Sequence, residues 1–162
     1  MNLESLRSLQ KRIREAKGAD RKLDAEIAIA LGLVSGAPWE IFTDRLGERT
    51  ARNSMSGTEV LLRDFGRYLK LPKLTSDPDG LGPCVALLEA VFPGALWSVW
   101  NMEHGPGARI LCPGKSGAFH DGQYAEVDEL SDWTPASVCH ALIDCAVSAL
   151  IAQEEAKEKA DA

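Results

Sequence analysis

Apolar residues recur every three or four positions at the start of the chain, over residues 3–16 and 21–31. This spacing predicts two short amphipathic helices, which a turn at Lys17–Ala19 joins. Asp20 is placed to cap the second helix, and Gly32 is placed to end it. We therefore expect a helical hairpin at the N-terminus.

The second half of the chain changes from a helical period to a strand period and back. A turn rich in Pro and Asp, in which Ser76 or Asp77 can act as the cap, leads into a helix that ends at Pro93–Gly94. Stretches rich in β-formers then predict three strands, over residues 95–102, 108–112 and 118–127. A closing helix is expected over about residues 135–157. The predicted fold class is α+β: an N-terminal helical region followed by a helix, a three-stranded antiparallel meander and a helix, arranged like an α-β-α sandwich.

Residues 33–70 show no sustained period. Three of them are strongly apolar: Trp39, Ile41 and Phe42. We expect part of this stretch to pack on the domain as a strand or an ordered loop, and a helix to run from Ser56 or Thr58 to about Leu69. The chain thus divides into an N-terminal helical hairpin, an irregular basic insertion with one short helix, and an α/β sandwich-like domain, over residues 1–32, 33–70 and 71–162.

The net charge of −6 hides a division along the chain. Residues 1–73 carry 14 Lys and Arg against 10 Asp and Glu, a balance of +4, whereas residues 74–162 carry 4 against 14, a balance of −10. An acidic chain is not a generic nucleic-acid binder. The opposed halves, together with the leucine stripe of the first helix, suggest a homodimer that packs basic front on acidic back.

Apolar runs stay far below the roughly 18 residues that span a bilayer, and charge follows closely on the N-terminus. We expect a cytoplasmic protein without a membrane partner.

Candidate catalytic groups are few. The four cysteines form no CxxC pair and read as buried free thiols, and no cofactor or metal is expected. His104, His120 and Cys112 offer the most plausible reactive groups if the chain is an enzyme. Gly114, Lys115 and Ser116 resemble the end of a phosphate-binding loop, but Arg109 stands where that loop needs glycine, so a plain hairpin turn is favoured.

Two further pairs are interpreted as structural. His140 and Asp144 lie four residues apart on the closing helix and read as an exposed charged pair, while the neighbouring cysteines point to the apolar side. Trp97 and Trp100 must face opposite sides of a strand. One of these two indoles is expected in the core, and the other packs under the N-terminal part or forms an exposed platform for a base or a partner side chain.

Cations and aromatics occur together mainly in the basic insertion, and such a mixture suits a nucleotide-like ligand. The candidate ligand- or partner-binding residues are Trp39, Arg45, Arg49, Arg52, Arg63, Arg67, Trp100 and Lys115.

Three stretches, residues 17–32, 71–100 and 134–153, together resemble a family of small bacteriophage and prophage proteins with an alpha-beta-alpha (ABA) sandwich domain. The first stretch matches at Asp20, Arg21, Leu23, Asp24, Ile27, Ala28 and Gly32. The second matches at Pro72, Thr75, Ser76 and Asp79 and departs from the pattern at Pro78 and Gly80. The third matches at Thr134, Pro135, Ala136, Cys139, Ala141 and Leu142. The resemblance covers roughly two thirds of the chain and leaves residues 33–70 unmatched.

The resemblance implies a phage or prophage accessory protein that acts in the cytoplasm of a bacterial host cell, and it brings no catalytic residues with it. By analogy with other small phage proteins, we expect a non-enzymatic protein that acts by binding, as an inhibitor of a host defence system does. Its partner would be a host or phage protein, or a signalling nucleotide that it sequesters. The alternatives are a small cysteine/histidine-dependent enzyme and a virion structural or assembly protein.

Overall fold

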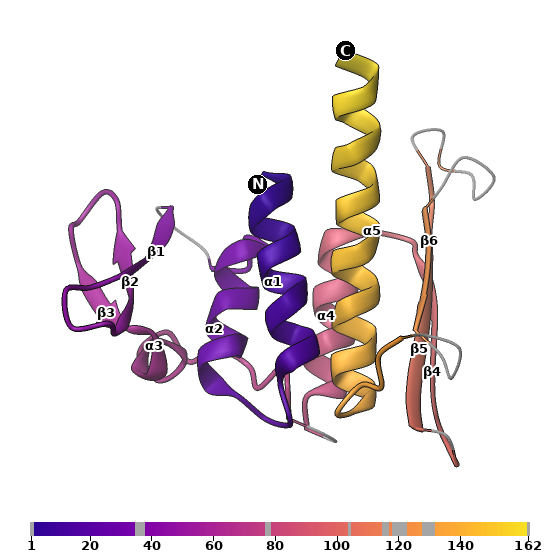
Figure 1. The fold of residues 1–162 in the computed structure, drawn as a ribbon, viewed down its shortest axis with the longest axis horizontal. Helices are drawn as coiled ribbons and strands as arrows, with labels where there is room; N and C mark the ends of the chain where they lie inside the picture. Colours follow the sequence, from indigo (N-terminus) through magenta and orange to yellow (C-terminus); the bar gives the residue numbers. More distant parts are fainter. Residues whose placement is uncertain are drawn as a thin grey trace.

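The computed structural model describes residues 2–34, 38–76, 79–103, 105–114, 117, 123–127 and 132–161. Within these residues the chain forms five helices and two antiparallel sheets of three strands each (Figure 1). The first part contains α1 (Leu3–Glu15), α2 (Arg21–Ala30), β1 (Trp39–Thr43), β2 (Arg49–Asn53), β3 (Glu59–Leu61) and α3 (Leu62–Tyr68). The second part contains α4 (Leu81–Val91), β4 (Leu96–Met102), β5 (Gly105–Cys112), β6 (Gln123–Val127) and α5 (Val138–Asp161).

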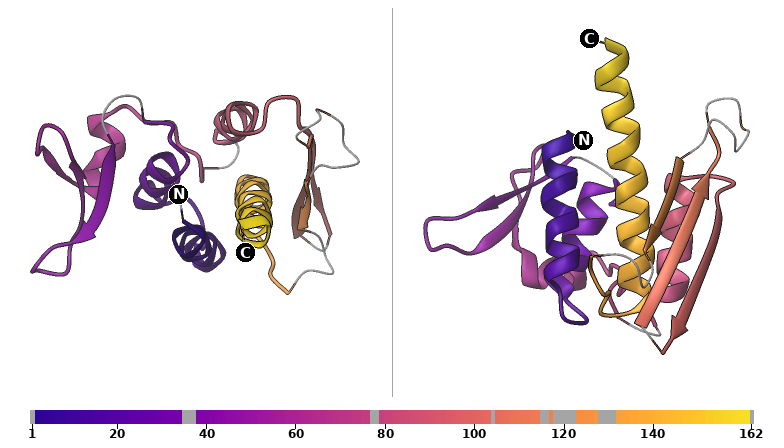
Figure 2. Two further views of the ribbon diagram at one scale, coloured as in Figure 1. Left: turned by 90° about the horizontal axis from the view of Figure 1, so that it is seen from above. Right: turned by 45° about the vertical axis from the view of Figure 1, so that its right-hand side comes forward.

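The elements stack in four layers (Figure 2). The sheet β4–β5–β6 lies at one end, followed by α4 and α5, then α1 and α2, and finally α3 with the sheet β1–β2–β3. The predicted α+β class, the N-terminal helices and the order helix, meander, helix are confirmed. Both helices that flank the meander in sequence lie on the same face of it, so its other face carries no helix of the described chain.

The main core forms where α5 passes between α1 and the second sheet. Leu6, Leu9 and Ile13 of α1 are buried there. Each such side chain stabilises the fold by about 1.5–3 kcal/mol. The leucine stripe, which suggested a dimer contact, therefore packs within the core of its own chain. Although α5 is 24 residues long, its end is charged, and none of the helices in the described ranges has the length and apolarity to cross a membrane.

The first sheet is the main departure from the expected structure. Residues 33–70 were expected to be irregular, yet β1, β2 and β3 pair in a regular antiparallel register. The predicted start of the helix at Ser56 or Thr58 is wrong, because Glu59–Leu61 pairs with β2 and the helix begins at Leu62. Ala51, Leu62 and Phe65 form a small second core with Ala25 of α2.

A hydrogen-bonded network joins the start of α2 to the segment before α4. Asp20 caps α2 as predicted, since its Oδ1 accepts from the N–H groups of Lys22 and Leu23. Asp24, which is 1 % exposed, accepts from the backbone N–H and the hydroxyl of Thr75 at 2.7 and 2.8 Å, and from Arg21 Nη1 at 2.7 Å. These residues belong to the stretches that carry the family resemblance, so their pattern has a structural explanation.

Candidate ligand groove

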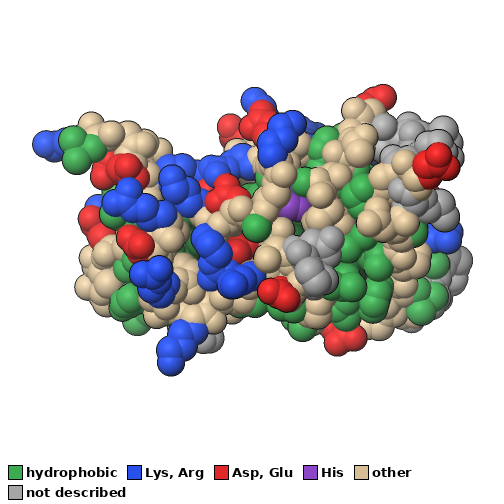
Figure 3. Space-filling model, turned by 90° about the horizontal axis from the view of Figure 1, so that it is seen from below, with side chains coloured by type: hydrophobic (Ala, Val, Ile, Leu, Met, Phe, Trp, Pro, Cys, Tyr) green, Lys and Arg blue, Asp and Glu red, His purple; other side chains and the backbone are tan. Residues whose placement is uncertain are grey.

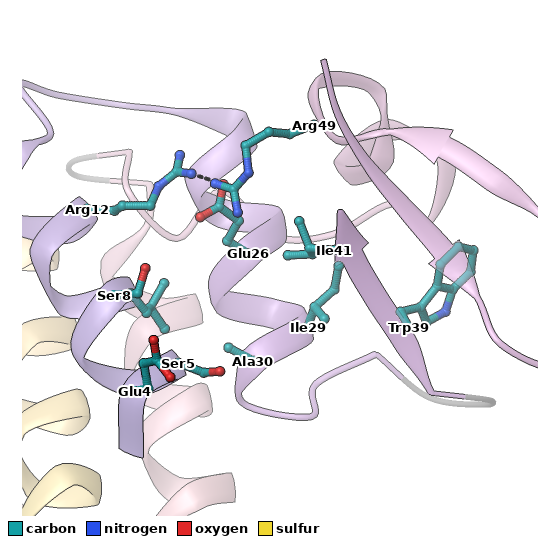
Figure 4. A pocket seen from close by; sticks show the side chains of 11 residues that line it. Glu4, Ser5, Ser8, Arg12, Glu26, Ile29, Ala30, Trp39, Ile41 and Arg49 are labelled. Carbon is teal, nitrogen blue, oxygen red and sulfur yellow. Dashed lines mark hydrogen bonds and ion pairs between the residues drawn. The ribbon is translucent and has the colours of Figure 1, made fainter. Parts of the chain in front are cut away.

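A groove of about 540 Å³ opens between α1, α2 and the first sheet (Figure 4). Helix α1 forms one wall, α2 forms the floor, and β1 and β2 form the other wall. The lining residues are Glu4, Ser5, Ser8, Leu9, Arg12, Glu26, Ile29, Ala30, Trp39, Ile41 and Arg49.

The polar end of the groove contains three charged side chains from three elements. Glu26 of α2 is only 4 % exposed. Its Oε1 accepts a hydrogen bond from Arg49 Nη1 of β2 and forms an ion pair with Arg12 Nη1 of α1 at 2.8 Å. Both guanidinium groups remain about one third exposed, at 31% and 35%. One carboxylate neutralises one of the two cations, so this end of the groove keeps an excess of one positive charge.

The rest of the groove is apolar on the sheet side and polar on the α1 side. Ile29 and Ile41 face the groove from α2 and β1, below the charged group in Figure 4. Ser5 and Ser8 line the opposite wall with their hydroxyl groups, and the Glu4 carboxylate lies beside Ser5, away from the charged group. A cleft of this composition suits a ligand with a charged end and an apolar or planar body.

Burial raises the pKa of Glu26 to about 7, and the attraction of Arg12 only partly opposes this shift. The carboxyl group is thus poised to change its charge close to neutral pH.

The stability of the fold should depend on pH through Glu26. The unfolded chain releases this proton near the ordinary pKa of 4.5, whereas the folded chain holds it until about 7. The free energy of unfolding should therefore fall as the pH rises through this window, by on the order of 1–3 kcal/mol. Urea titrations of the wild type and Glu26→Gln between pH 4 and 8 measure the effect. The free energy of unfolding of Glu26→Gln relative to that of the wild type should increase as the pH rises. The same pH dependence of unfolding in both proteins would contradict the prediction.

Two of the residues predicted from the sequence, Trp39 and Arg49, line this groove. The Trp39 ring packs edge-on against Phe65, with 4.8 Å between the ring centroids, and against Tyr68 at 6.5 Å. Its indole is thus engaged by α3 and is not a free stacking surface within the groove.

The other predicted cations do not converge on this groove. Arg52 lies over the Phe42 ring at 4.7 Å and pairs with Glu59 on the exposed face of the first sheet. Arg63 approaches Glu48 at 3.6 Å, and Arg45 and Arg67 are exposed. Trp100 lies on the second sheet, and Lys115 is outside the described residues.

Lys and Arg side chains gather on the lower face of the molecule, on the side of α3 and the first sheet (Figure 3). A second hollow of about 470 Å³ opens at the start of α2, lined by residues 16–22 and Arg63. The Asp20 side chain already accepts hydrogen bonds from N–H groups at that helix end. The hollow therefore has fewer free donors for an anion than the groove has.

The interpretation of His140 and Asp144 as an exposed pair is wrong, since both are 0% exposed. Helix α5 is surrounded on several sides by α1, α4 and the second sheet, which the helical pattern alone does not reveal. Ser137 Oγ lies 2.9 Å from His140 Nδ1, and Asp144 binds Arg14 through Nε at 2.9 Å and Nη2 at 3.0 Å.

The four cysteines are buried free thiols, as predicted. Burial raises the pKa of Cys112 to about 11 and raises the pKa of Cys145 further. The pKa of Cys84 is also raised strongly, first by its hydrogen bond with Cys139 and then by burial. Thiols of this kind are poor nucleophiles. His104 and His120, the other groups of the enzymatic alternative, lie outside the described residues.

Sequence reasoning missed Arg12 and Glu26. Arg12 lies on the charged side of α1 and reads as solvated. Glu26 did carry a signal, because it interrupts the otherwise apolar run from Ala25 to Leu31. A lone carboxylate on a buried helix face needs a cationic partner from another element.

Comparison with protein-family models, curated proteins and solved structures gives no match to this chain, so what the groove can bind follows from its own geometry and chemistry.

Proposed function

We propose that this chain is a non-enzymatic phage or prophage accessory protein that binds a small anionic ligand in the groove between α1, α2 and the first sheet. The observation that carries the proposal is the convergence of Arg12 and Arg49 on the single buried carboxylate of Glu26. The unbalanced positive charge is partly shielded from water, where an ion pair with a ligand gains most.

A nucleotide is the ligand class that fits the groove best. Its phosphate would bind the two guanidinium groups, which present several donors in a fixed plane. Its base and sugar would lie against Ile29 and Ile41, within reach of the hydroxyl groups of Ser5 and Ser8. The volume of about 540 Å³ accommodates one nucleotide-sized molecule. Sequestration of a signalling nucleotide is thus favoured over capture of an effector protein as the anti-defence mechanism.

Arg49→Glu should weaken nucleotide binding at least tenfold, because it removes one phosphate donor and adds a repelling charge. Isothermal titration calorimetry with adenosine monophosphate, a cyclic mononucleotide and a cyclic dinucleotide measures the change, with inorganic phosphate as the minimal anion. The matched control is Arg52→Glu, which makes the same charge change on β2 but at the exposed pair with Glu59. It should bind as the wild type does.

Arg49→Gln serves as a milder second variant, because Arg49→Glu also brings a second carboxylate near Glu26. Circular dichroism of both variants reports whether the fold is retained. Equal affinity of the wild type, Arg49→Gln and Arg52→Glu for every probe, or no binding by the wild type, would overturn the proposal.

A further inference from the structure

The outer face of the second sheet has no covering layer in the described chain. Helices α4 and α5 lie on its inner face, where Ala108, Ile110 and Cys112 are buried (Figure 2). Residues that alternate with these point outward. Leu96 and Tyr124 are both 57% exposed on this outer face.

The outward-facing residues include several large apolar side chains, which is unusual for a face exposed to solvent. Register places Leu96, Leu111 and Tyr124 side by side across the three strands. The indole of Trp100 lies against Gly107, where a β-carbon would collide with the ring. The exposed face of an antiparallel sheet is usually polar, and an aromatic and aliphatic patch on it is typical of an interaction surface.

A row of polar residues crosses this patch and carries both signs of charge. Register pairs Ser98 with Arg109 and Arg109 with Glu126. Arg109 Nε donates to Ser98 Oγ at 3.0 Å, and Tyr124 donates its hydroxyl to Glu126. A positive and a negative side chain therefore lie on neighbouring strands, both exposed. Such a surface is complementary to itself.

We propose that the outer face of β5 and β6 docks against the same face of a second copy of this chain. A two-fold axis that runs parallel to the strands, between β5 and β6, brings β5 of each copy over β6 of the other. Arg109 then meets the second copy's Glu126, and Leu111 meets the second copy's Tyr124, each contact occurring twice. Leu96 and Trp100 border the interface.

The size of the face sets the strength of the dimer. Strands about 4.8 Å apart with a rise of about 3.3 Å per residue give the overlapping β5 and β6 strands a contact of roughly 160 Å² on each copy. Stable dimers bury about 800 Å² on each partner. The contact is therefore weak, with a dissociation constant expected on the order of hundreds of micromolar.

Sedimentation equilibrium from about 10 µM to 1 mM protein tests this dimer, and the concentration range brackets the expected dissociation constant. Arg109→Glu makes the face negative and Glu126→Arg makes it positive. Each variant alone should be monomeric throughout the range. An equimolar mixture of the two should form heterodimers, because the opposite faces attract. If Arg109 and Glu126 interacted only within one chain, mixing the two variants would not produce heterodimers.

The first sheet supplies a matched control, since Arg52 and Glu59 form a similar cross-strand pair there. Arg52→Glu and Glu59→Arg should each dimerise as the wild type does. Arg49→Glu should also dimerise normally, so a failure of the ligand groove and a failure of this interface are distinguishable.

Three outcomes would overturn the proposal: a wild type that is monomeric at 1 mM, variants that remain dimeric, or a mixture that remains monomeric. We use Arg109→Gln and Glu126→Gln as milder variants, in case the charge reversals disturb the fold. Each should weaken dimer association partially.

Discussion

Asp24→Ala is expected to lower the free energy of unfolding by about 3–5 kcal/mol, the cost of breaking a buried charged network by removing one partner. The substitution leaves the buried backbone N–H of Thr75 without its acceptor, and leaves the Thr75 hydroxyl only the longer contact to the Asp20 carbonyl group at 3.3 Å. It also removes the carboxylate that Arg21 binds. Arg21 additionally donates to the carbonyl groups of Leu71 and Pro72, so the segment that leads to α4 loses its anchor.

Urea denaturation followed by circular dichroism measures this loss. Asp24→Asn keeps an amide oxygen for Thr75 but gives up the charge, and it should show a smaller loss than Asp24→Ala. Asp64→Ala is the control, because that carboxylate is 56% exposed and its ion pair within the described residues is the 3.7 Å contact with Arg63. It should change stability by less than about 0.5 kcal/mol. Losses of similar size at positions 24 and 64 would contradict the network's role.

Arg14→Ala is expected to cost about 3–5 kcal/mol at pH 7, because it leaves the carboxylate of Asp144 buried without a counter-charge. Asp144 is fully buried within α5, and Arg14 binds it with two nitrogen atoms. The guanidinium also lies 5.7 Å from the Trp133 ring, and the Trp133 indole donates to the Arg14 carbonyl group at 2.8 Å. The pair thus connects α1, α5 and the segment before α5.

The double variant Arg14→Met/Asp144→Leu should recover most of this loss, since it removes both charges together. Arg7→Ala is the control on the same two helices, because Arg7 and Glu155 are 59% and 38% exposed and pair at 2.7 Å. Exposed pairs contribute only about 0–1 kcal/mol. Thermal and urea unfolding of the three variants check the order, and a double variant no more stable than Arg14→Ala would contradict the explanation.

Local patterns predicted the elements whose signals are local. The apolar period and the Asp20 cap indicated α2 with its start, and the β-formers of residues 95–102 indicated β4. The first sheet was not predicted because β2 has the sequence RTARN, which lacks large apolar residues. The buried residues of this strand are Thr50 and Ala51. Its strands are defined by pairing with one another and by packing on α2, which no short window of sequence contains.

The distance along the chain also explains which groove residues could be predicted from the sequence. Arg49 and Trp39 were candidates because they lie in a basic stretch with aromatics, whereas Arg12 is 14 residues from Glu26 and 37 from Arg49 in sequence. The burial of Asp144 likewise depends on a helix 130 residues away. Contacts between distant segments decide which charged residues are solvated and which are paired.

Helix α2 is shared by two separate cores. Leu23 and Ile27 pack into the main core, while Ala25 packs with Phe65 beneath the first sheet. A small core of this kind opens more readily than a large one, so we expect the first sheet and α3 to unfold together at a lower local free energy than the main core. The groove lies across the boundary, with walls from both units. A ligand held there would be linked thermodynamically to closure of the first sheet, and part of its binding energy would be spent in holding the two units together.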